Sequence, residues 1–576
     1  MTTRPTETPL AWLGALRLGI GLGQGVALYA LGTLVRGAGV HPLVTAHPRA
    51  YGVAVLLAGL APFPLLLGLG HFRPRVLAGW VLAAALLILG LGWHDLGQNA
   101  RPDLPLPSPR LVVALSAILF IGHALLAARE ADRARGGRGL PRYADLFEAS
   151  WRGALQLAQA VAFVGSFWIV FWVGDQMFRA IGIGALNSLA RRHAFVLPVS
   201  FGLGALAVHA ADAREDMARG LRRLALGLEA WLTPLLAVLV AAFLLALPVT
   251  GLGPLLARSY AIPSLLFAAA MLVLLTNAVH QDGREAPPRL LDLSARLAGI
   301  LLVPLTALAA WGLALRVLEY GWTEARVAGA AALVLLALYA LGYAAAALRP
   351  GMRLLEPVNV LAAGVAILVL AALNTPLADP VRLSVASQTG RLLRGEVPPE
   401  RFDFAWLARA GRDGRQAREA LLTNPNPVIA ERAGNRARPR RSWEAPVARG
   451  PVRLEAAPAG AALPAGLLAA VEAELQGAAA EASRPQCTEP GCVARALPLE
   501  GREAWLVGPV HGDFWAMVPK GEGWRRLAIY RAPFHCRERA RGGIAETGPR
   551  PLPPRLPELE ANGVRLEPVL PRRDCG

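Results

Sequence analysis

Charge is scarce in this chain of 576 residues, and lysine and cysteine are nearly missing. Only 17% of the residues are charged, whereas soluble proteins carry about a quarter. Lys520 is the only lysine, and the first 486 residues contain no cysteine. The length would allow several soluble domains, but the low charge and long apolar runs argue against them.

Recognised catalytic motifs are also missing. The sequence contains no GxxxxGK[ST], HExxH, GxSxG or Rossmann glycine pattern, which argues against an ATPase, a metalloprotease and a serine hydrolase. We therefore expect no cofactor and no metal ion. A membrane-embedded transferase stays open, because the residues of such a site are often scattered along the chain.

Hydrophobic residues make up 54% of the sequence and are concentrated in long runs. A bilayer core about 30 Å thick needs roughly 20 apolar residues in a helix, and helices satisfy their own backbone groups in lipid. The first run lacks a small-residue cleavage site, so we expect it to be a span and not a cleaved signal peptide. About eleven spans are predicted, at 12–35, 51–70, 76–93, 110–128, 154–182, 195–211, 226–250, 262–280, 297–318, 326–347 and 356–374.

Arginines give the chain a net charge of +18 and fall mainly in alternate loops. A basic chain can bind nucleic acid, but arginines between spans mark cytoplasmic loops, so we expect a lipid bilayer and no nucleic acid. The N-terminus is then cytoplasmic, and an odd number of spans places the C-terminal domain outside the cytoplasm. The short run 195–211 matters most, because without it every later loop would change sides. The arginine-rich loops are 73–75, 129–152, 214–223, 284–296 and 349–353.

The composition changes after residue 374. We predict a transmembrane helical domain at 1–374, a junction and Pro/Arg-rich linker at 375–450, and a small extracytoplasmic α+β domain at 451–576. The junction is expected to contain one amphipathic helix at 402–422. The last domain is expected to have a helix at 463–482 and strands at 504–507, 514–518 and 524–530, from their apolar periodicity. Trp505, Trp515 and Trp524 lie in these strands and form either its core or an aromatic binding face.

All four cysteines lie in this last domain, at Cys487, Cys492, Cys536 and Cys575. An even number of cysteines outside the cytoplasm favours disulfides, with three possible pairings. The alternative is a zinc site that also uses His511 or His535, but the spacing of Cys487 and Cys492 is loose for one.

Polar residues at membrane depth are costly and are candidate functional residues. Asp175 is either a proton or substrate site or the partner of Arg179, one turn later; we favour the ion pair. Asn277, His280 and Asp282 close another span, where they form either a proton relay or an ordinary helix end.

Three further polar residues, His209, Asp212 and Glu229, are expected to form an interfacial charge cluster, and His123 to be packed. Four glycines in the first run have GxxxG spacing, which predicts close helix packing. They are Gly19, Gly21, Gly23 and Gly25.

Several ordered motifs lie between residues 140 and 422. This set resembles a bacterial inner-membrane family catalogued as domain of unknown function 4153. The resemblance implies a multi-span protein with an extracytoplasmic tail and implies no known activity, so no catalytic residue is carried over. The motifs are Tyr143–Trp151, Asn277–Gly283, Arg316–Arg326 and Asn374–Pro380, followed by Ser387, Gln388 and Arg391.

Asp379, Gln388 and Arg391 follow the last span and form either a rigid junction or a site at the outer face. Three functions stay open. The first is an envelope anchor whose periplasmic domain binds a protein, lipid or cell-wall partner. The second is a transporter or flippase with a polar pathway through Asp175, Asn277 and His280, and the third is a membrane-embedded enzyme acting on lipid-linked substrates.

Overall fold

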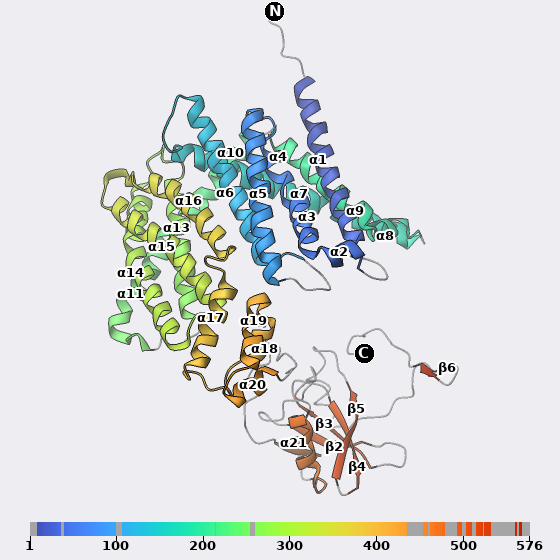
Figure 1. Ribbon diagram of the computed structural model, residues 1–576. Coiled ribbons are helices and arrows are strands. Elements are labelled where there is room, and N and C mark those ends of the chain that lie inside the picture. Colours follow the sequence, from blue (N-terminus) through green and yellow to red (C-terminus); the bar gives the residue numbers. More distant parts are fainter. Residues whose placement is uncertain are drawn as a thin grey trace, which may run out of the picture. The chain divides into compact units, whose positions relative to one another are not determined.

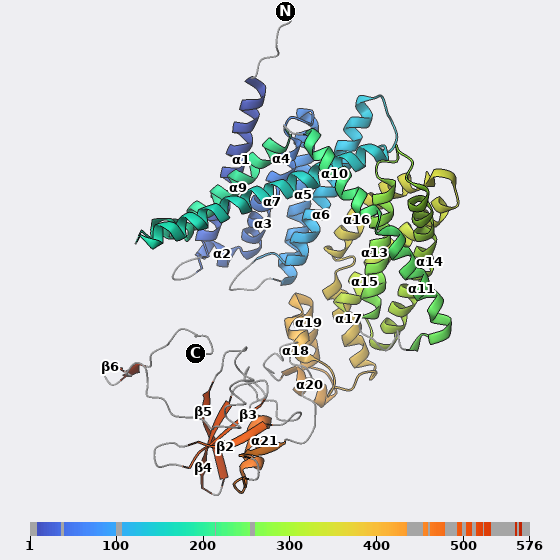
Figure 2. The same ribbon diagram turned by 180° about the vertical axis from the view of Figure 1, so that it is seen from behind.

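The computed structural model divides into two units, Met1–Asn435 and Arg436–Gly576, each described here by itself. The first unit is helical and the second contains a small sheet (Figures 1 and 2). The structure describes residues 8–35, 40–99, 106–181, 183–212, 215–253, 260–434, 453–458, 461–477, 492–497, 503–509, 514–521, 523–530, 559–561 and 564–566.

Among the described residues, eleven helical segments are long and apolar enough to cross a membrane, which confirms the predicted number. The short run 195–211 is one of them, as His193–Asp212. The spanning helices are α1 (Thr8–Thr33), α3 (Pro48–Leu60) with α4 (Pro62–Gly68), α5 (Pro74–Asn99), α6 (Pro109–Ala134), α7 (Tyr143–Ala180), α9 (His193–Asp212), α10 (Glu215–Ala230) with α11 (Thr233–Thr250), α13 (Ala261–His280), α14 (Arg289–Tyr320), α15 (Glu324–Ala347) and α16 (Leu355–Leu373). Shorter helices α2 (Pro42–Ala46), α8 (Ala185–Ala190) and η1 (Pro350–Met352) connect them.

The helices form two packed groups. One contains α1, α3 and α9 and the other contains α11, α13, α14 and α15, while α16 packs against α6, α7 and α15 and so joins the groups (Figures 1 and 2). A continuous core of small and branched residues fills the second group; Ala269, Leu272, Ala298, Leu302 and Tyr343 are each completely buried.

Glycines allow α1 and α9 to pack closely, as the GxxxG spacing predicts. A Cβ on Gly21 would lie 2.4 Å from the Phe201 carbonyl oxygen, and a Cβ on Gly25 would lie 2.4 Å from Pro198 Cα. Of the two GxxxG pairs, only Gly21 and Gly25 lie at the contact with α9, because a Cβ on Gly19 or Gly23 would meet nothing within 4 Å.

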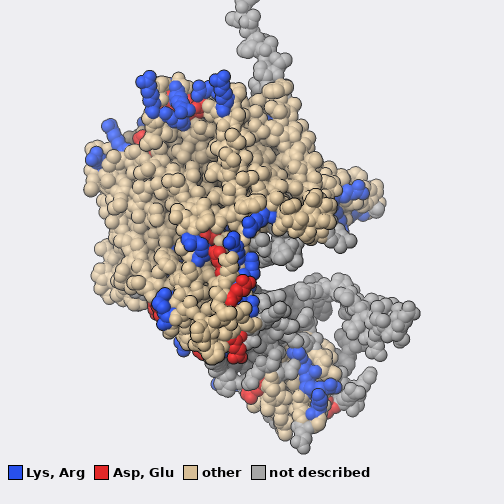
Figure 3. All heavy atoms as spheres, viewed as in Figure 1, with Lys and Arg blue, Asp and Glu red and all other residues tan. Residues whose placement is uncertain are grey.

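The arginine-rich loops, which the sequence assigns to one side of the membrane, contact one another. Within the arginine-rich set, Arg73 pairs with Glu130 at 2.8 Å, and Arg296 donates to the Arg349 carbonyl at 3.1 Å. Figure 3 shows basic side chains gathered over this end, near the turn between α6 and α7. These contacts join loops that alternate along the chain, as expected if the loops lie on one side of the membrane. The packing therefore agrees with an odd number of spans.

A small helical bundle follows the last span. It consists of α17 (Pro380–Leu393), α18 (Phe404–Arg409), α19 (Gly411–Leu422) and α20 (Pro427–Gly434). The prediction of a single helix at 402–422 is wrong, because the helix breaks at Gly411, whose φ is +64°. Only glycine adopts this conformation readily, and the break lets α19 fold back so that a Cβ on Gly414 would lie 2.2 Å from the Leu407 carbonyl oxygen.

The second unit contains a five-stranded sheet with the strand order β1-β2-β3-β4-β5. The strands are β1 (Leu454–Ala457), β2 (Cys492–Ala496), β3 (Trp505–Pro509), β4 (Phe514–Lys520) and β5 (Gly523–Tyr530), and a separate pair is formed by β6 (Leu559–Ala561) and β7 (Val564–Leu566). Strands β2 to β5 form an antiparallel meander, which confirms the three predicted strands, whereas β1 pairs in parallel with β2. The predicted helix is α21 (Leu467–Gly477), and residues 478–482 lie outside the described residues.

The tryptophans of the meander belong to the core of the second unit. Trp505 and Trp515 are buried with Leu467 and Val471 of α21, and Trp524 packs against this cluster. The Trp524 indole N–H donates to the Ala465 carbonyl at 3.1 Å. The structure therefore supports the core interpretation over an exposed aromatic binding face.

Candidate functional site

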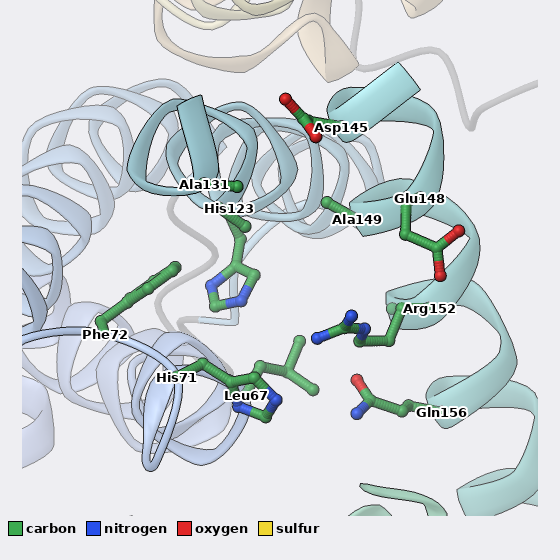
Figure 4. Close-up of a pocket in the computed structure, with 12 residues that line it drawn as sticks. Leu67, His71, Phe72, His123, Ala131, Asp145, Glu148, Ala149, Arg152 and Gln156 are labelled. Carbon is green, nitrogen blue, oxygen red and sulfur yellow. The ribbon is translucent and has the colours of Figure 1, made fainter. Parts of the chain in front are cut away.

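A polar cavity of about 230 Å³ lies at the arginine-rich end of the first unit (Figure 4). Leu67 lies in the last turn of α4, and His71 and Phe72 lie in the connection that follows. His123 comes from α6, and Arg152 and Gln156 come from α7. We call it the histidine cavity, and its lining residues are Leu67, His71, Phe72, His123, Ala127, Ala131, Asp145, Glu148, Ala149, Arg152, Gly153 and Gln156.

A second cavity of about 440 Å³ shares five lining residues with the histidine cavity. We call it the adjoining cavity. It carries three arginines, Arg73, Arg133 and Arg152, but only one carboxylate, Glu130. Arg73 and Arg133 both pair with Glu130, at 2.8 and 3.1 Å.

A buried ion pair lies beside the histidine cavity. Arg17 of α1 is completely buried and contacts Asp212 of α9 at 2.5 Å. Its Nη2 donates to the Leu69 carbonyl at 2.8 Å, and its Nη1, which contacts Asp212, also lies 3.5 Å from His209 Nδ1. An arginine costs several kcal/mol at membrane depth, so these contacts explain how the first span tolerates it.

Asp212 connects this ion pair with the histidine cavity. It accepts a hydrogen bond from the Gln156 amide, and one of its oxygens lies 4.0 Å from His71 Nε2. The charge cluster predicted from His209, Asp212 and Glu229 thus contains Arg17, Gln156 and His71, whereas Glu229 lines a different cavity together with Asn277.

Asn277 belongs to a different network, in the second group of helices. It accepts hydrogen bonds from Asn359 at 2.9 Å and from Tyr143 at 3.4 Å, and Asn359 also accepts from Tyr343 at 3.0 Å. Tyr143, Asn277 and Asn359 line a cavity of about 580 Å³ whose other walls are largely apolar.

His280 and Asp282 lie at the edge of the Asn277 network. His280 Nε2 is 3.8 Å from a carboxylate oxygen of Glu356 on α16. Asp282 pairs with the exposed Arg284 at 3.7 Å and caps its backbone N–H. Both of these contacts of Asp282 are with Arg284, just after the end of α13.

Asp175 is not close to this network. It pairs with Arg179 at 2.8 Å on the same helix, as the favoured interpretation predicts. Tyr143, which contacts Asn277, begins α7, and Asp175 lies 32 residues further along that helix. At a rise of 1.5 Å per residue this is about 48 Å, so Asp175, Asn277 and His280 do not line one pathway.

Asp379 lies at the opposite, arginine-poor end and is completely buried. One oxygen accepts from the Val381 N–H at 2.8 Å and caps α17, and the other lies 2.9 Å from His94 Nε2. Arg110 lies 3.8 Å away. This arrangement ties the ends of α5, α6 and α16 to the start of α17.

Gln388 and Arg391 bind the turn between α14 and α15. The Gln388 amide donates to the carbonyls of Tyr320 and Trp322, both at 2.9 Å, and Arg391 donates to the Glu319 carbonyl at 2.6 Å. Two separate motifs of the resemblance thus bind each other, and the contacts are those of a packed junction.

Of the four cysteines, only Cys492 lies in the described residues, where it is completely buried in β2. Cys487, Cys536 and Cys575, and the alternative zinc ligands His511 and His535, lie outside them. Within the described part of the chain, no group of three or more His, Cys, Asp or Glu side chains could hold a metal ion.

Sequence reasoning missed Arg17, His71 and Arg152 as members of one polar centre. A signal was present for Arg17, because it interrupts the first apolar run. No local pattern connects it to His71 or Arg152, because the three residues come from different helices and connections.

The fold and these polar centres define a polytopic helical membrane protein that carries a separate sheet domain. The family described as Domain of unknown function (DUF4153) matches residues 52–421, and the chain belongs to this family. No curated protein and no solved structure matches the chain.

Proposed function

We propose that this protein is an envelope anchor of the bacterial inner membrane. Its helical unit would hold the C-terminal domain in the periplasm, where that domain would bind an envelope protein, a lipid or a cell-wall component. The observation that carries the proposal is the odd number of spans in a chain that divides into a helical unit and a separate sheet unit.

The arginine distribution supports this orientation. The eleven candidate spans among the described residues would bring the two termini to opposite sides of the bilayer, and the arginine-rich loops contact one another at one end of the helical unit. The positive-inside rule assigns that end to the cytoplasm, which gives a periplasmic C-terminus.

The cysteines support a periplasmic tail independently of the arginines. The helical unit contains none, and the second unit contains all four. Disulfides persist in the periplasm and are rare in the cytoplasm, so we propose that these cysteines pair. The tryptophans occupy the core, and the partner would therefore bind another surface of the sheet domain.

Reporter fusions test the orientation. Alkaline phosphatase fused after Gly576 should be active, and the same enzyme inserted after Gly136, in the loop between α6 and α7, should be inactive. A fluorescent protein should give the reverse pattern. An inactive phosphatase at Gly576 together with fluorescence there would overturn the periplasmic anchor.

A second candidate, a transporter or flippase, is favoured by the buried pair of Arg17 and Asp212 with His209 and His71 beside it. Ionisable residues inside membrane helices often serve proton relays. In proteoliposomes that contain a pH-sensitive dye, proton uptake under an imposed potential should be at least about ten-fold slower in Asp212→Asn. Uptake by the wild-type protein no faster than by empty liposomes would remove this candidate.

The third class, an enzyme on lipid-linked substrates at the outer face, is not favoured. Asp379 is completely buried, and Arg391 is engaged by a backbone carbonyl and Glu396. Both side chains contribute to the packed junction.

A further inference from the structure

The cavity of about 580 Å³ that contains Asn277 has the composition of a small-molecule site. It lies between α6, α7, α10, α13, α15 and α16, and we call it the aromatic cavity. Ligand sites of this size are lined mainly by apolar and aromatic side chains, with a few polar groups that orient the ligand. The lining includes five aromatic residues, Phe120, Tyr143, Phe147, Trp151 and Tyr339, and one charged residue, Glu229.

The polar groups of the aromatic cavity lie toward the arginine-rich end of the helical unit. Tyr143 is the first residue of α7, Glu229 is the last but one of α10, and Asn277 lies in the last turn of α13. Ala270 also lines the cavity, seven residues before Asn277 on the same helix, which places it about 10 Å deeper in the span. A ligand that fills the cavity therefore has a polar end near the membrane surface and an apolar end further in.

Three of the aromatic residues form one face of α7. Tyr143, Phe147 and Trp151 follow one another at intervals of four residues, so they project from the same side of the helix. The ring centroids of Tyr143 and Phe147 are 6.0 Å apart, and those of Phe147 and Trp151 are 6.3 Å apart. The faces of aromatic rings attract cations, most strongly where water is excluded. The aromatic cavity therefore offers a cation a row of rings.

Glu229 is the one carboxylate of the aromatic cavity, and no arginine, lysine or histidine is among the described residues that line it. Glu229 lies inside the candidate span Leu224–Thr250 and is partly buried. Its side chain forms no hydrogen bond and no ion pair in the described part of the chain. An ionised side chain inside a span is costly unless an opposite charge compensates it. A bound cation would supply that charge.

We propose that the aromatic cavity binds a lipophilic organic cation, in which an ammonium group is attached to an apolar chain. Glu229 would pair with the charge, the aromatic face of α7 would contact the ammonium methyl groups, and the chain would extend toward Ala270. Leu274 lines the cavity in the middle of a span and is 49% exposed, so the ligand could enter from the bilayer. The site is independent of the anchor function, because it requires nothing of the C-terminal domain.

Isothermal titration calorimetry of the full-length protein, purified in an uncharged detergent, tests the proposal with octyltrimethylammonium as the probe. Titration into detergent alone gives the background. Octanoate, which carries the opposite charge on a similar chain, should bind at least about ten-fold more weakly, because Glu229 repels it. Glu229→Gln should weaken octyltrimethylammonium binding about ten-fold, because the attraction between the charges is lost, and should leave the binding of neutral octanol unchanged. The matched control is Glu324→Gln, which removes an exposed carboxylate at the arginine-poor end and should change neither affinity.

A second variant tests the location. Ala270 is exposed, so Ala270→Leu narrows the aromatic cavity without disturbing the helix core, and it should weaken the binding of octyltrimethylammonium and of octanol alike. Unchanged binding of both probes by Ala270→Leu would overturn the location.

Three results would overturn the cation assignment. The first is wild-type protein that binds octanoate as tightly as octyltrimethylammonium, and the second is unchanged octyltrimethylammonium affinity in Glu229→Gln. The third is octanol binding as tight as that of the cation, which would indicate a neutral lipid. If Glu229→Gln does not elute as a single species in size-exclusion chromatography, the comparison of the three probes on the wild-type protein decides.

Discussion

The two ends of the helical unit use their carboxylates differently. At the arginine-poor end, Asp95 accepts from the Ser108 N–H and Asp379 accepts from the Val381 N–H, both at 2.8 Å. At the arginine-rich end, Asp212 instead contacts the side chains of Arg17 and Gln156. Asp95 and Asp379 thus fix the start of a helix, and Asp379 also contacts the His94 side chain. The described contacts of Asp212 are with side chains alone, and they join α1, α7 and α9.

The cavities follow the same division. The histidine cavity and the adjoining cavity lie beside Asp212, whereas Gln388 and Arg391 at the other end bind backbone carbonyls of a turn. The polar residues of the arginine-poor end thus bind other parts of the fold, whereas these two cavities lie at the arginine-rich end.

The largest expected effect is that of Asp379→Ala, which tests the difference between the two ends of the helical unit. Asp379→Ala removes the cap of α17 and leaves His94 without its partner at 2.9 Å. Loss of a cap costs about 1 kcal/mol, and removal of one partner of a buried pair costs about 3 kcal/mol. The free energy of unfolding should therefore fall by about 3 kcal/mol or more, as measured by denaturant unfolding in detergent.

Asp282→Ala provides the matched control at the other end. Its partner Arg284 is largely exposed, and an exposed ion pair contributes at most about 1 kcal/mol. If both variants lose the same stability, the proposed difference between the two ends is wrong.

Periodicity and apolar length predicted most of the fold. Eleven spans follow from run length, because backbone groups in lipid leave few alternatives to the helix. The three predicted strands follow from short apolar segments such as Trp505–Pro509. Strand β1 was missed because Leu454–Ala457 is small and alanine-rich, and its pairing depends on a distant partner, β2.

The polar centres could be predicted only in part. Asp175 and Arg179 are one turn apart, so their ion pair is a local property that spacing reveals. Arg17 and Asp212 are 195 positions apart in sequence, and their contact depends on the packing of α1 against α9 through Gly21 and Gly25. The junction residues Gln388 and Tyr320 are likewise brought together by the fold alone.

The smallest expected effect concerns Glu396, an exposed carboxylate just beyond α17. Hydrogen bonds from Arg394 and Arg391 lower the pKa of Glu396 below its ordinary value of 4.5. A carboxyl whose pKa is lower in the folded state stabilises the fold above its unfolded pKa, and this contribution disappears as pH falls through the folded value. Glu396→Gln should therefore shift the unfolding midpoint slightly at pH 7 and not at all in acid below the folded pKa. Unfolding curves of both proteins at the two pH values measure this, and a shift that persists unchanged in acid would show that Glu396 acts through something other than its charge.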